Sequence, residues 1–334
     1  MNEDESRLTV AGLGERALIE RVTSLFGPAP AHEVWSGDDT AVLEAPQEAL
    51  LFTTDLMVED VDFRRSYASG FDVGWKLVAI NASDVASMGG RPWRAVANLS
   101  LPEDTEVAFV DDLAEGIVAA CSEWDIGLVG GDFSAGREIS ASLAMIGLAD
   151  GEQRVLRNGA NPGHILCVTG ALGGSAGGLV VLEEGIDDGP SRDSLVSRHL
   201  RPRARVREGR ALAGVASAMI DISDGLAVDL GHLTAASHVG CEVTLEALPL
   251  DDGLRWLGSV HPDTDPGGLA LLGGEDFELL LTLDGGNWDE ARARVEAVGT
   301  SLSRIGTITD GPARIGGRDL EKWRAEGWEH LRSR

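Results

Sequence analysis

Residues 50–55 read LLFTTD, an apolar run that ends in two hydroxyl side chains and a carboxylate. Residues 35–39, WSGDD, end in acid in the same way. Short apolar segments that are bounded by polar residues are typical of strands. We therefore expect strands that each lead into a loop carrying a carboxylate.

The residues on either side alternate between helical and extended patterns. Upstream, apolar residues at near-helical spacing predict an amphipathic helix over residues 14–26. Downstream, residues 72–88 predict a helix that carries Lys76, Asn81 and Asp84 and is stopped by a glycine pair. Further elements are expected as strands at 94–101, 126–133 and 139–149 and as a helix at 104–124. The first half is therefore predicted to be a mixed α+β domain.

A change of composition near Asp150 marks a domain boundary. Residues 157–163, RNGANPG, are typical of a turn-rich linker. Beyond them the pattern predicts a strand at 164–169, a glycine-rich turn into a helix at 170–184, and then alternating strands and helices. A chain of 334 residues also exceeds the usual size of one domain. We expect two domains, residues 1–150 and 151–334.

The charge balance excludes several classes of partner. Asp and Glu total 55 against 28 Lys and Arg, a formal charge of −27, which repels nucleic-acid phosphates and anionic lipid. No apolar run approaches the roughly 20 residues that a membrane helix needs. The first residues, MNEDE, are acidic where a secretory signal would be basic, so we expect a cytoplasmic protein.

The three cysteines suggest neither a disulfide framework nor a zinc site. Cys121, Cys167 and Cys241 lie far apart and form no Cys-x-x-Cys pair. We interpret them as small buried apolar residues in a reducing compartment.

Familiar nucleotide signatures are absent from the sequence. It contains no Gly-x-x-x-x-Gly-Lys loop, no complete Gly-x-Gly-x-x-Gly fingerprint and no His-Glu-x-x-His. The run at residues 170–175, GALGGS, could bind an anion at a helix start, although glycine turns there are more often structural. Lys76 is more often a solvent-facing helix residue than a phosphate ligand.

Aspartates recur in short loops instead. They fall at residues 37–39, 53–55, 81–84, 130–132 and 221–225. A single Asp beside Gly commonly caps a helix or forms a turn. Several such acids together favour magnesium, which takes carboxylate, hydroxyl and phosphate oxygens and can lie between the carboxylates and a triphosphate. The pattern indicates a multi-metal phosphate site without naming a substrate.

Five longer motifs resemble those of thiamine-monophosphate kinases. They are residues 37–43 (GDDTAVL), 53–59 (TTDLMVE), 81–89 (NASDVASMG), 220–226 (IDISDGL) and 273–279 (GGEDFEL). The resemblance as a whole spans about residues 12–330 in order along the chain, and jointly the five motifs are highly specific. The wider superfamily includes aminoimidazole ribonucleotide synthetase and selenophosphate synthetase.

The resemblance implies an architecture and an assembly. Residues 1–150 would form an N-terminal α+β domain that binds ATP and metal and whose sheet pairs with that of a second subunit to form a barrel. Residues 151–334 would form a C-terminal α/β domain that completes the nucleotide and substrate site. A homodimer follows from this arrangement.

The resemblance also implies the site residues. Several magnesium ions would be held by Asp39, Thr53, Thr54, Asp55, Asp84, Asp132, Asp221 and Asp224. ATP would contact Gly131, Asp132, Arg157 and Ser223. The thiamine moiety would be met by Glu275 and Trp328, although packing of the chain end is another role open to Trp328. The reaction would be transfer of the ATP γ-phosphoryl group to thiamine monophosphate, with no covalent nucleophile and no general base.

One position departs from the family. Where relatives usually have a substrate-side histidine, this chain has Asp62. An acid near the acceptor phosphate opposes its charge unless a metal, Arg64 or Arg65 compensates. Two alternatives therefore stay open: a paralogous kinase with another small phosphorylated acceptor, and a non-catalytic nucleotide-binding protein of the same fold.

Overall fold

The computed structural model describes residues 8–36 and 39–327 and divides into two compact units. The first contains the chain through Val85 together with Arg91–Ala149, and the second contains Ala86–Gly90 together with the chain from Asp150. Each unit is built around its own sheet. The functional roles expected for the two domains stay predictions.

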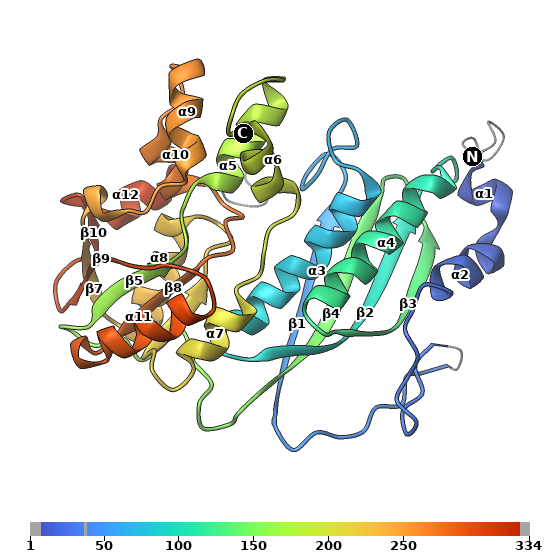
Figure 1. Cartoon of the computed structure of the whole chain (residues 1–334), viewed down its shortest axis with the longest axis horizontal. Helices are drawn as coiled ribbons and strands as arrows, with labels where there is room; N and C mark the ends of the chain where they lie inside the picture. Colours follow the sequence, from blue (N-terminus) through green and yellow to red (C-terminus); the bar gives the residue numbers. More distant parts are fainter. Residues whose placement is uncertain (1–7, 37–38, 328–334) are drawn as a thin grey trace. The chain divides into compact units, whose positions relative to one another are not determined.

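The N-terminal unit is a four-stranded sheet with helices on one face (Figure 1). Its elements are α1 (Val10–Leu13), α2 (Glu15–Thr23), β1 (Ala49–Val58), α3 (Gly70–Ser87), β2 (Arg91–Leu101), α4 (Val107–Glu123), β3 (Gly127–Ala135) and β4 (Ser140–Ala149). The strand order is β1-β4-β2-β3, with β2 and β3 parallel and the other two pairs antiparallel. The other helices and strands predicted for this half are confirmed, with shifts of one to three residues at most ends. The prediction of a strand at residues 35–39 is wrong, because the described residues there form no strand and the segment is flanked by an isolated bridge between Val34 and Val42.

Glycines let α3 and α4 pack with their backbones nearly touching. A Cβ added at Gly74 would lie 2.0 Å from the carbonyl oxygen of Leu113, and one added at Gly116 would lie 2.2 Å from that of Phe71. Only glycine fits at such distances. The pair therefore covers the sheet as a tight layer and fixes the position of α3, which carries Asp84.

One local prediction about β1 is wrong. The strand was expected to end at Asp55, but it continues to Val58, and Asp55 pairs with Leu143 in the middle of the β1–β4 ladder. The cause is the apolar continuation at residues 56–58, LMV, which keeps the strand paired. Asp55 is therefore a strand residue whose side chain leaves a fixed face of the sheet.

The C-terminal unit is a seven-stranded sheet in the order β11-β10-β7-β9-β5-β8-β6. Its strands are β5 (Ile165–Thr169), β6 (Ala218–Asp221), β7 (Gly240–Val243), β8 (Leu279–Leu283), β9 (Leu302–Thr309), β10 (Arg314–Ile315) and β11 (Arg318–Asp319). Its helices are α5 (Gly174–Glu183), α6 (Arg192–Leu200), α7 (Val206–Leu212), α8 (Leu226–Ser237), α9 (Asp252–Val260), α10 (Pro266–Leu272), α11 (Trp288–Ala297) and α12 (Leu320–Arg324), with short 3₁₀ turns η2 (Leu245–Ala247) and η3 (Gly285–Asn287).

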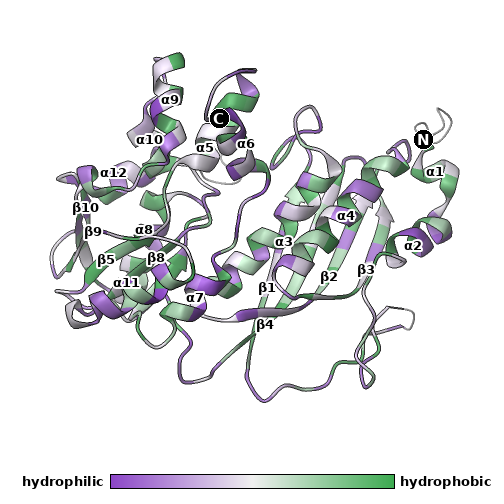
Figure 2. Ribbon diagram, viewed as in Figure 1, coloured by the Kyte–Doolittle hydropathy of each residue, from purple (hydrophilic) through white to green (hydrophobic). Residues whose placement is uncertain are grey.

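Both faces of this sheet are buried. Leu166 and Val168 on β5 pack in one core with residues of α8, while Cys167 between them packs in a second core with residues of α11. Alternate residues of a strand point to opposite faces, so a strand that is buried on both sides is apolar throughout. Strand β5 accordingly carries the hydrophobic colour in Figure 2.

The predicted mixed α+β fold with two domains is confirmed by these two units. Within the described residues of one chain, neither sheet closes into a barrel. None of the helices in those residues is both long and apolar enough to span a bilayer.

The interpretation of the cysteines as small buried apolar residues is also confirmed, while the reducing compartment stays a prediction. All three thiols are buried and free. Burial raises the pKa of Cys121 to about 12, so that thiol stays neutral and behaves as an apolar side chain.

Candidate functional site

Three of the predicted metal ligands lie on the helix-covered side of the N-terminal sheet. Thr53 and Asp55 leave the same face of β1, because they are two residues apart on one strand. The Thr53 hydroxyl donates a hydrogen bond to the Asp84 carboxylate on α3. Thr53, Asp55 and Asp84 are half-buried, so their oxygens are held in place and remain reachable.

Two other predicted ligands leave the opposite face. Thr54 is exposed beside Thr53. The ladder places Asp132 in one row with Asn98, Ser142 and Leu56, whereas Asp55 lies in the neighbouring row. Neighbouring rows of a sheet present their side chains to opposite faces. Asp132 is therefore not brought to Asp55 within this sheet.

Gly131 lies on β3 directly against the backbone of β2. A Cβ added there would lie 2.0 Å from the carbonyl oxygen of Ala97, so the position admits only glycine. Gly131 thus has a packing reason in addition to its predicted contact with ATP.

A cavity of about 350 Å³ adjoins this glycine. Its walls come from α2, α4, β2, β3 and the segment around Trp35, and they are mainly apolar. Gly131 and Asp132 lie in its lining, and so does Asp39, which is exposed. The cavity therefore combines an apolar interior with two of the predicted metal carboxylates.

The Trp35 wall of the cavity is fixed by a buried ion pair. The indole Nε1 donates to Glu33 at 2.8 Å, and the Arg94 guanidinium binds the same carboxylate at 2.8 Å while it stacks 5.0 Å from the Trp35 ring. Burial would raise the pKa of Glu33, but its bonds to Trp35 and Arg94 hold it below its usual range. The glutamate stays charged and keeps the indole in position.

In the C-terminal unit, strand β6 ends at Asp221 and a short loop carries Ser223 and Asp224 into α8. Asp221 is buried, whereas Ser223 and Asp224 are half-buried. Gly225 has a φ of 110°, which favours glycine at the turn before the helix. The predicted carboxylate loop at a strand end is confirmed here.

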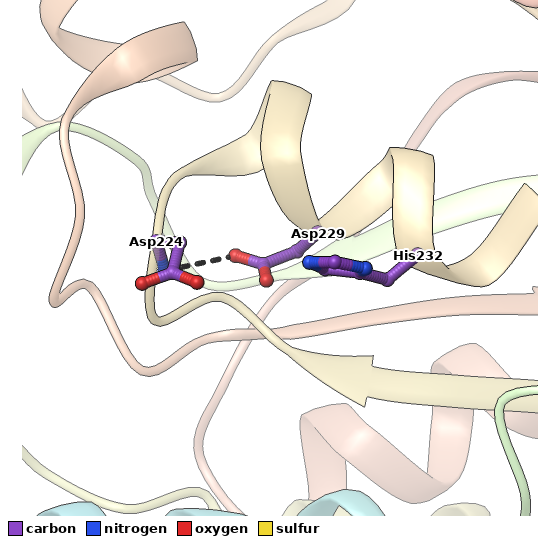
Figure 3. A group of neighbouring side chains, drawn as sticks. All are labelled: Asp224, Asp229 and His232. Atoms are coloured by element: carbon purple, nitrogen blue, oxygen red, sulfur yellow. Dashed lines mark hydrogen bonds between the residues drawn. The ribbon is translucent and has the colours of Figure 1, made fainter. Parts of the chain in front are cut away.

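Two residues of α8, Asp229 and His232, were missed by the sequence interpretation. Figure 3 shows both beside Asp224, and one ligand atom from each of the three lies within 4.8 Å of the others. Burial, and then the charges of Asp221 and Asp224, raise the pKa of Asp229 well above its usual range. Asp229 and His232 are three residues apart on one helix, a spacing that could have signalled a shared face.

Arg157 belongs to the same neighbourhood. Burial, followed by the positive charges of Arg324 and Arg157, lowers the pKa of His232. The Arg157 side chain is exposed, and its backbone carbonyl accepts a hydrogen bond from Ser237 at 3.2 Å. The predicted ATP ligand thus lies near the Asp224 cluster.

The segment Gly273–Glu278 runs beside this loop. The N–H of Glu275 donates to the carbonyl of Ser223 at 2.8 Å, and the N–H of Phe277 donates to that of Ile222 at 2.9 Å. Glu275 and Phe277 have φ values of 65° and 49°, which are rare for residues with a side chain and are often found at functional sites. The Glu275 carboxylate lies 3.3 Å from Nδ1 of His199.

The start of α5 is already occupied by a carboxylate of the protein. Asp276 accepts hydrogen bonds from the N–H groups of Gly173 and Ser175 at 2.6 and 3.1 Å. Burial raises the pKa of Asp276 to about 6, against the opposing influence of Arg198 and these two N–H groups. The glycine run at residues 170–175 is therefore structural, which is the commoner of the two roles considered from sequence.

Glu278 fixes the end of the segment. It is fully buried and binds Arg205 through both oxygens at 2.5 and 2.7 Å, with Thr169 at 2.8 Å. Burial would raise the pKa of Glu278, but the charge and hydrogen bonds of Arg205 hold it below its usual range. A fully paired buried carboxylate anchors the segment that carries Glu275.

The structure revises the surroundings of Asp62. Its carboxylate accepts the N–H of Val58 at 2.8 Å and closes the turn after β1. Arg65, one of the three groups named as able to compensate it beside a metal and Arg64, binds Glu106 and stacks 4.9 Å from the Phe109 ring. The predicted role of Asp62 at the acceptor stays a prediction.

Two other residues named from the sequence are Lys76 and Trp328. Lys76 was expected to face solvent, which is wrong, because it is only 4% exposed within the tightly packed α3. Trp328 lies outside the described residues.

Both halves of the chain match one class of protein. The model of the AIR synthase related protein N-terminal domain matches residues 37–149, and that of the C-terminal domain matches residues 161–316. The thiamine-monophosphate kinase of Aquifex aeolicus (strain VF5) is 37% identical over 296 residues, which cover 88% of this chain and 92% of that protein. The chain belongs to the thiamine-monophosphate kinase family.

Solved structures agree with this assignment. The thiamine-monophosphate kinase of Stenotrophomonas maltophilia K279a has a TM-score of 0.82 at 34% identity, with 90% of this chain and 96% of that chain covered. A structure described as AaThiL complexed with AMPPCP and TMP has a TM-score of 0.76 at 35% identity, with 92% and 95% covered. The resemblance seen in the five sequence motifs is confirmed.

Proposed function

We propose that this protein transfers the γ-phosphoryl group of ATP to the phosphate of thiamine monophosphate, giving thiamine diphosphate and ADP. The observation in this chain that carries the proposal is that Thr53 and Asp55 leave one face of β1 and that Thr53 is hydrogen-bonded to Asp84 on α3. Membership of the family over nearly the whole chain supports it, as does the relative described with AMPPCP and TMP.

The residues present fit magnesium. Thr53, Asp55 and Asp84 offer hydroxyl and carboxylate oxygens, the hard ligands that this ion takes. Near Asp224, burial and then the charges of Asp221 and Asp224 raise the pKa of Asp229, and a bound cation would relieve this repulsion between carboxylates. We assign Asp39, Thr53, Thr54, Asp55, Asp84, Asp132, Asp221 and Asp224 as the residues that would hold several ions. When bound, the ions would neutralise charge on the transferring phosphoryl group.

The chain's own residues would bind and orient the two substrates. The acceptor phosphate is already ionised, so no general base is needed, and positioning carries most of the rate. ATP would contact Gly131, Asp132, Arg157 and Ser223. The apolar cavity beside Gly131 suits a flat nucleotide base, because ligand pockets are mainly apolar with a few placed polar groups.

Acceptor recognition falls to three positions. Glu275 would place its carboxylate near the positively charged thiazolium ring of the acceptor, and its contact with His199 limits where that carboxylate can point. Trp328 would stack on the same ring. Asp62 lies at the position where relatives usually have histidine, and its bond to Val58 takes up part of its carboxylate.

We also propose a homodimer. Leu50, Phe52 and Leu56 on β1 are 57%, 74% and 58% exposed, and they leave the same face of the strand. A row of exposed apolar side chains on a strand at the edge of a sheet is unfavourable in water. Pairing of this sheet with that of a second copy would cover the row and would form the barrel that the family resemblance implies.

Product identification tests the proposed function. Wild-type protein with ATP, magnesium and thiamine monophosphate should form thiamine diphosphate and ADP in equal amounts. ATP turnover only with another acceptor would establish a paralogous kinase. ATP binding without turnover would establish a non-catalytic protein.

A further inference from the structure

Asp229 lies outside the ligand set that the family resemblance implies, yet it is one of the most enclosed acids in the chain. Its side chain is 2% exposed at the start of α8. One oxygen, Oδ2, accepts hydrogen bonds from the N–H groups of both Ser223 and Asp224, each at 3.1 Å. A single carboxylate therefore holds two consecutive peptide groups of the loop.

Ser223 is held from the other side as well. Its carbonyl accepts the N–H of Glu275 at 2.8 Å. Glu275 has a φ of 65°, a conformation that a non-glycine residue keeps only when its surroundings enforce it. The N–H of Ser223 thus binds Asp229, and the carbonyl of Ser223 binds the N–H of Glu275. Asp229 and Glu275 are therefore linked through Ser223 by consecutive hydrogen bonds.

Direct metal binding is the other role that its position suggests. Asp229 lies close to Asp224 and His232, as Figure 3 shows. His232, however, is exposed. The Asp229 carboxylate accepts hydrogen bonds from two backbone N–H groups of the loop, and such contacts fix a loop conformation.

We propose that Asp229 is a positioning residue that sets the conformation of Ser223 and Asp224 and, through the Ser223 carbonyl, that of Glu275. The inference rests on the proposed function, in which these three residues meet ATP, magnesium and acceptor. On this proposal, the buried Asp229 carboxylate fixes both the loop that meets ATP and magnesium and the residue that meets the acceptor, all within the C-terminal unit.

Two substitutions separate the roles. Asp229→Asn keeps an oxygen that can accept both N–H groups, whereas Asp229→Ala removes it. The alanine variant should raise the KM for thiamine monophosphate roughly tenfold to a hundredfold, the usual effect of losing a residue that orients a site, and the asparagine variant should restore most of it. Asp284→Ala is the matched control, because Asp284 also accepts a backbone N–H, from Gly286 at 2.8 Å, and is exposed away from the loop.

A double-mutant cycle tests the connection to Glu275. If Asp229 acts through Glu275, the KM of the Asp229→Ala, Glu275→Gln double variant should fall short of the product of the single effects by about threefold or more. Fully multiplicative effects would show that the two residues act independently and would overturn the connection.

Amide hydrogen exchange gives a readout that does not need the reaction. Exchange over residues 222–225 and 273–277 should be faster in Asp229→Ala and close to wild type in Asp229→Asn and Asp284→Ala. Unchanged exchange at 273–277 in the alanine variant, or an asparagine variant that exchanges as fast as alanine, would overturn the proposal. Should the alanine variant fail to fold, the asparagine variant decides: kept protection supports positioning and lost protection contradicts it. A wild type that makes no thiamine diphosphate would refute the proposed function while this comparison still decides on Asp229.

Discussion

The hydroxyl of Thr53 on β1 donates a hydrogen bond to the carboxylate of Asp84 on α3. The contact joins a strand and a helix that are 31 residues apart in sequence, and both residues belong to the predicted magnesium set. It orients Asp84 toward the strand face from which Asp55 also leaves.

Removing this hydroxyl should weaken metal use. We expect Thr53→Val to raise the magnesium concentration for half-maximal rate by roughly tenfold to a hundredfold, because the half-buried Asp84 carboxylate loses its donor and a ligand is lost. Thr53→Ser keeps the hydroxyl and should stay within a few-fold of wild type. Magnesium titrations of the initial rate check this, and equal titrations for the valine variant and wild type would remove Thr53 from the site.

Much of this site follows from local sequence. Alternation along β1 gives Thr53 and Asp55 one face, and helical spacing puts Asp84 on α3. The same alternation shows that the Thr54 side chain leaves the opposite face of β1. The motif alone does not distinguish Thr54 from Thr53. The end of β1 was misplaced because a carboxylate was taken as a stop, although strand pairing with β4 tolerates it.

Contacts between distant segments could not be predicted. Asp276 caps α5 from about a hundred residues away, and Asp229 holds a loop through backbone N–H groups that no sequence pattern marks. The burial of Lys76 depends on how closely α3 and α4 pack. The glycines allow this close packing, but their presence in the sequence does not predict it. Such features depend on tertiary packing and not on periodicity.

Neutralising Asp62 should not harm acceptor binding. Asp62→Asn keeps an acceptor for the Val58 N–H and removes the charge. Since a carboxylate beside a phosphate is repelled by roughly 1 kcal/mol even in water, the KM for thiamine monophosphate should stay the same or fall by up to about fivefold. Asp62→His should likewise keep activity or lower this KM. A tenfold rise in KM for a well-folded Asp62→Asn variant would show that the charge itself is required.

Asp276 should make stability depend on pH. Its folded pKa of about 6 lies above the unfolded value of about 3.9, so the folded state binds more protons between these values. Stability from this group is therefore present at low pH and declines as pH rises from about 4 to about 6, by up to about 3 kcal/mol. Urea unfolding of wild type and Asp276→Asn across this range measures it, and the wild type should lose stability relative to the variant. A difference that does not change with pH would contradict the expectation.

Placing a charge on the apolar face of β1 should separate the subunits. Phe52 is 74% exposed in one chain, and Phe52→Asp would put a carboxylate into the proposed interface. Light scattering should show a dimer for wild type and the 35.2 kDa monomer for this variant. Val260→Asp, at a 51% exposed apolar position on α9, is the control and should remain dimeric. A wild type that stays monomeric at all concentrations would refute the homodimer.

The most direct test of the account is product formation by wild type and Asp55→Asn, incubated with ATP, magnesium and thiamine monophosphate. Asp55→Asn removes a charge but almost no volume, so its fold should match wild type by circular dichroism. The account predicts thiamine diphosphate and ADP from wild type in a one-to-one ratio, and a rate at least roughly a hundredfold lower from Asp55→Asn at saturating magnesium. A well-folded wild type that binds ATP yet forms no thiamine diphosphate, or an Asp55→Asn variant that matches its rate, would contradict the account.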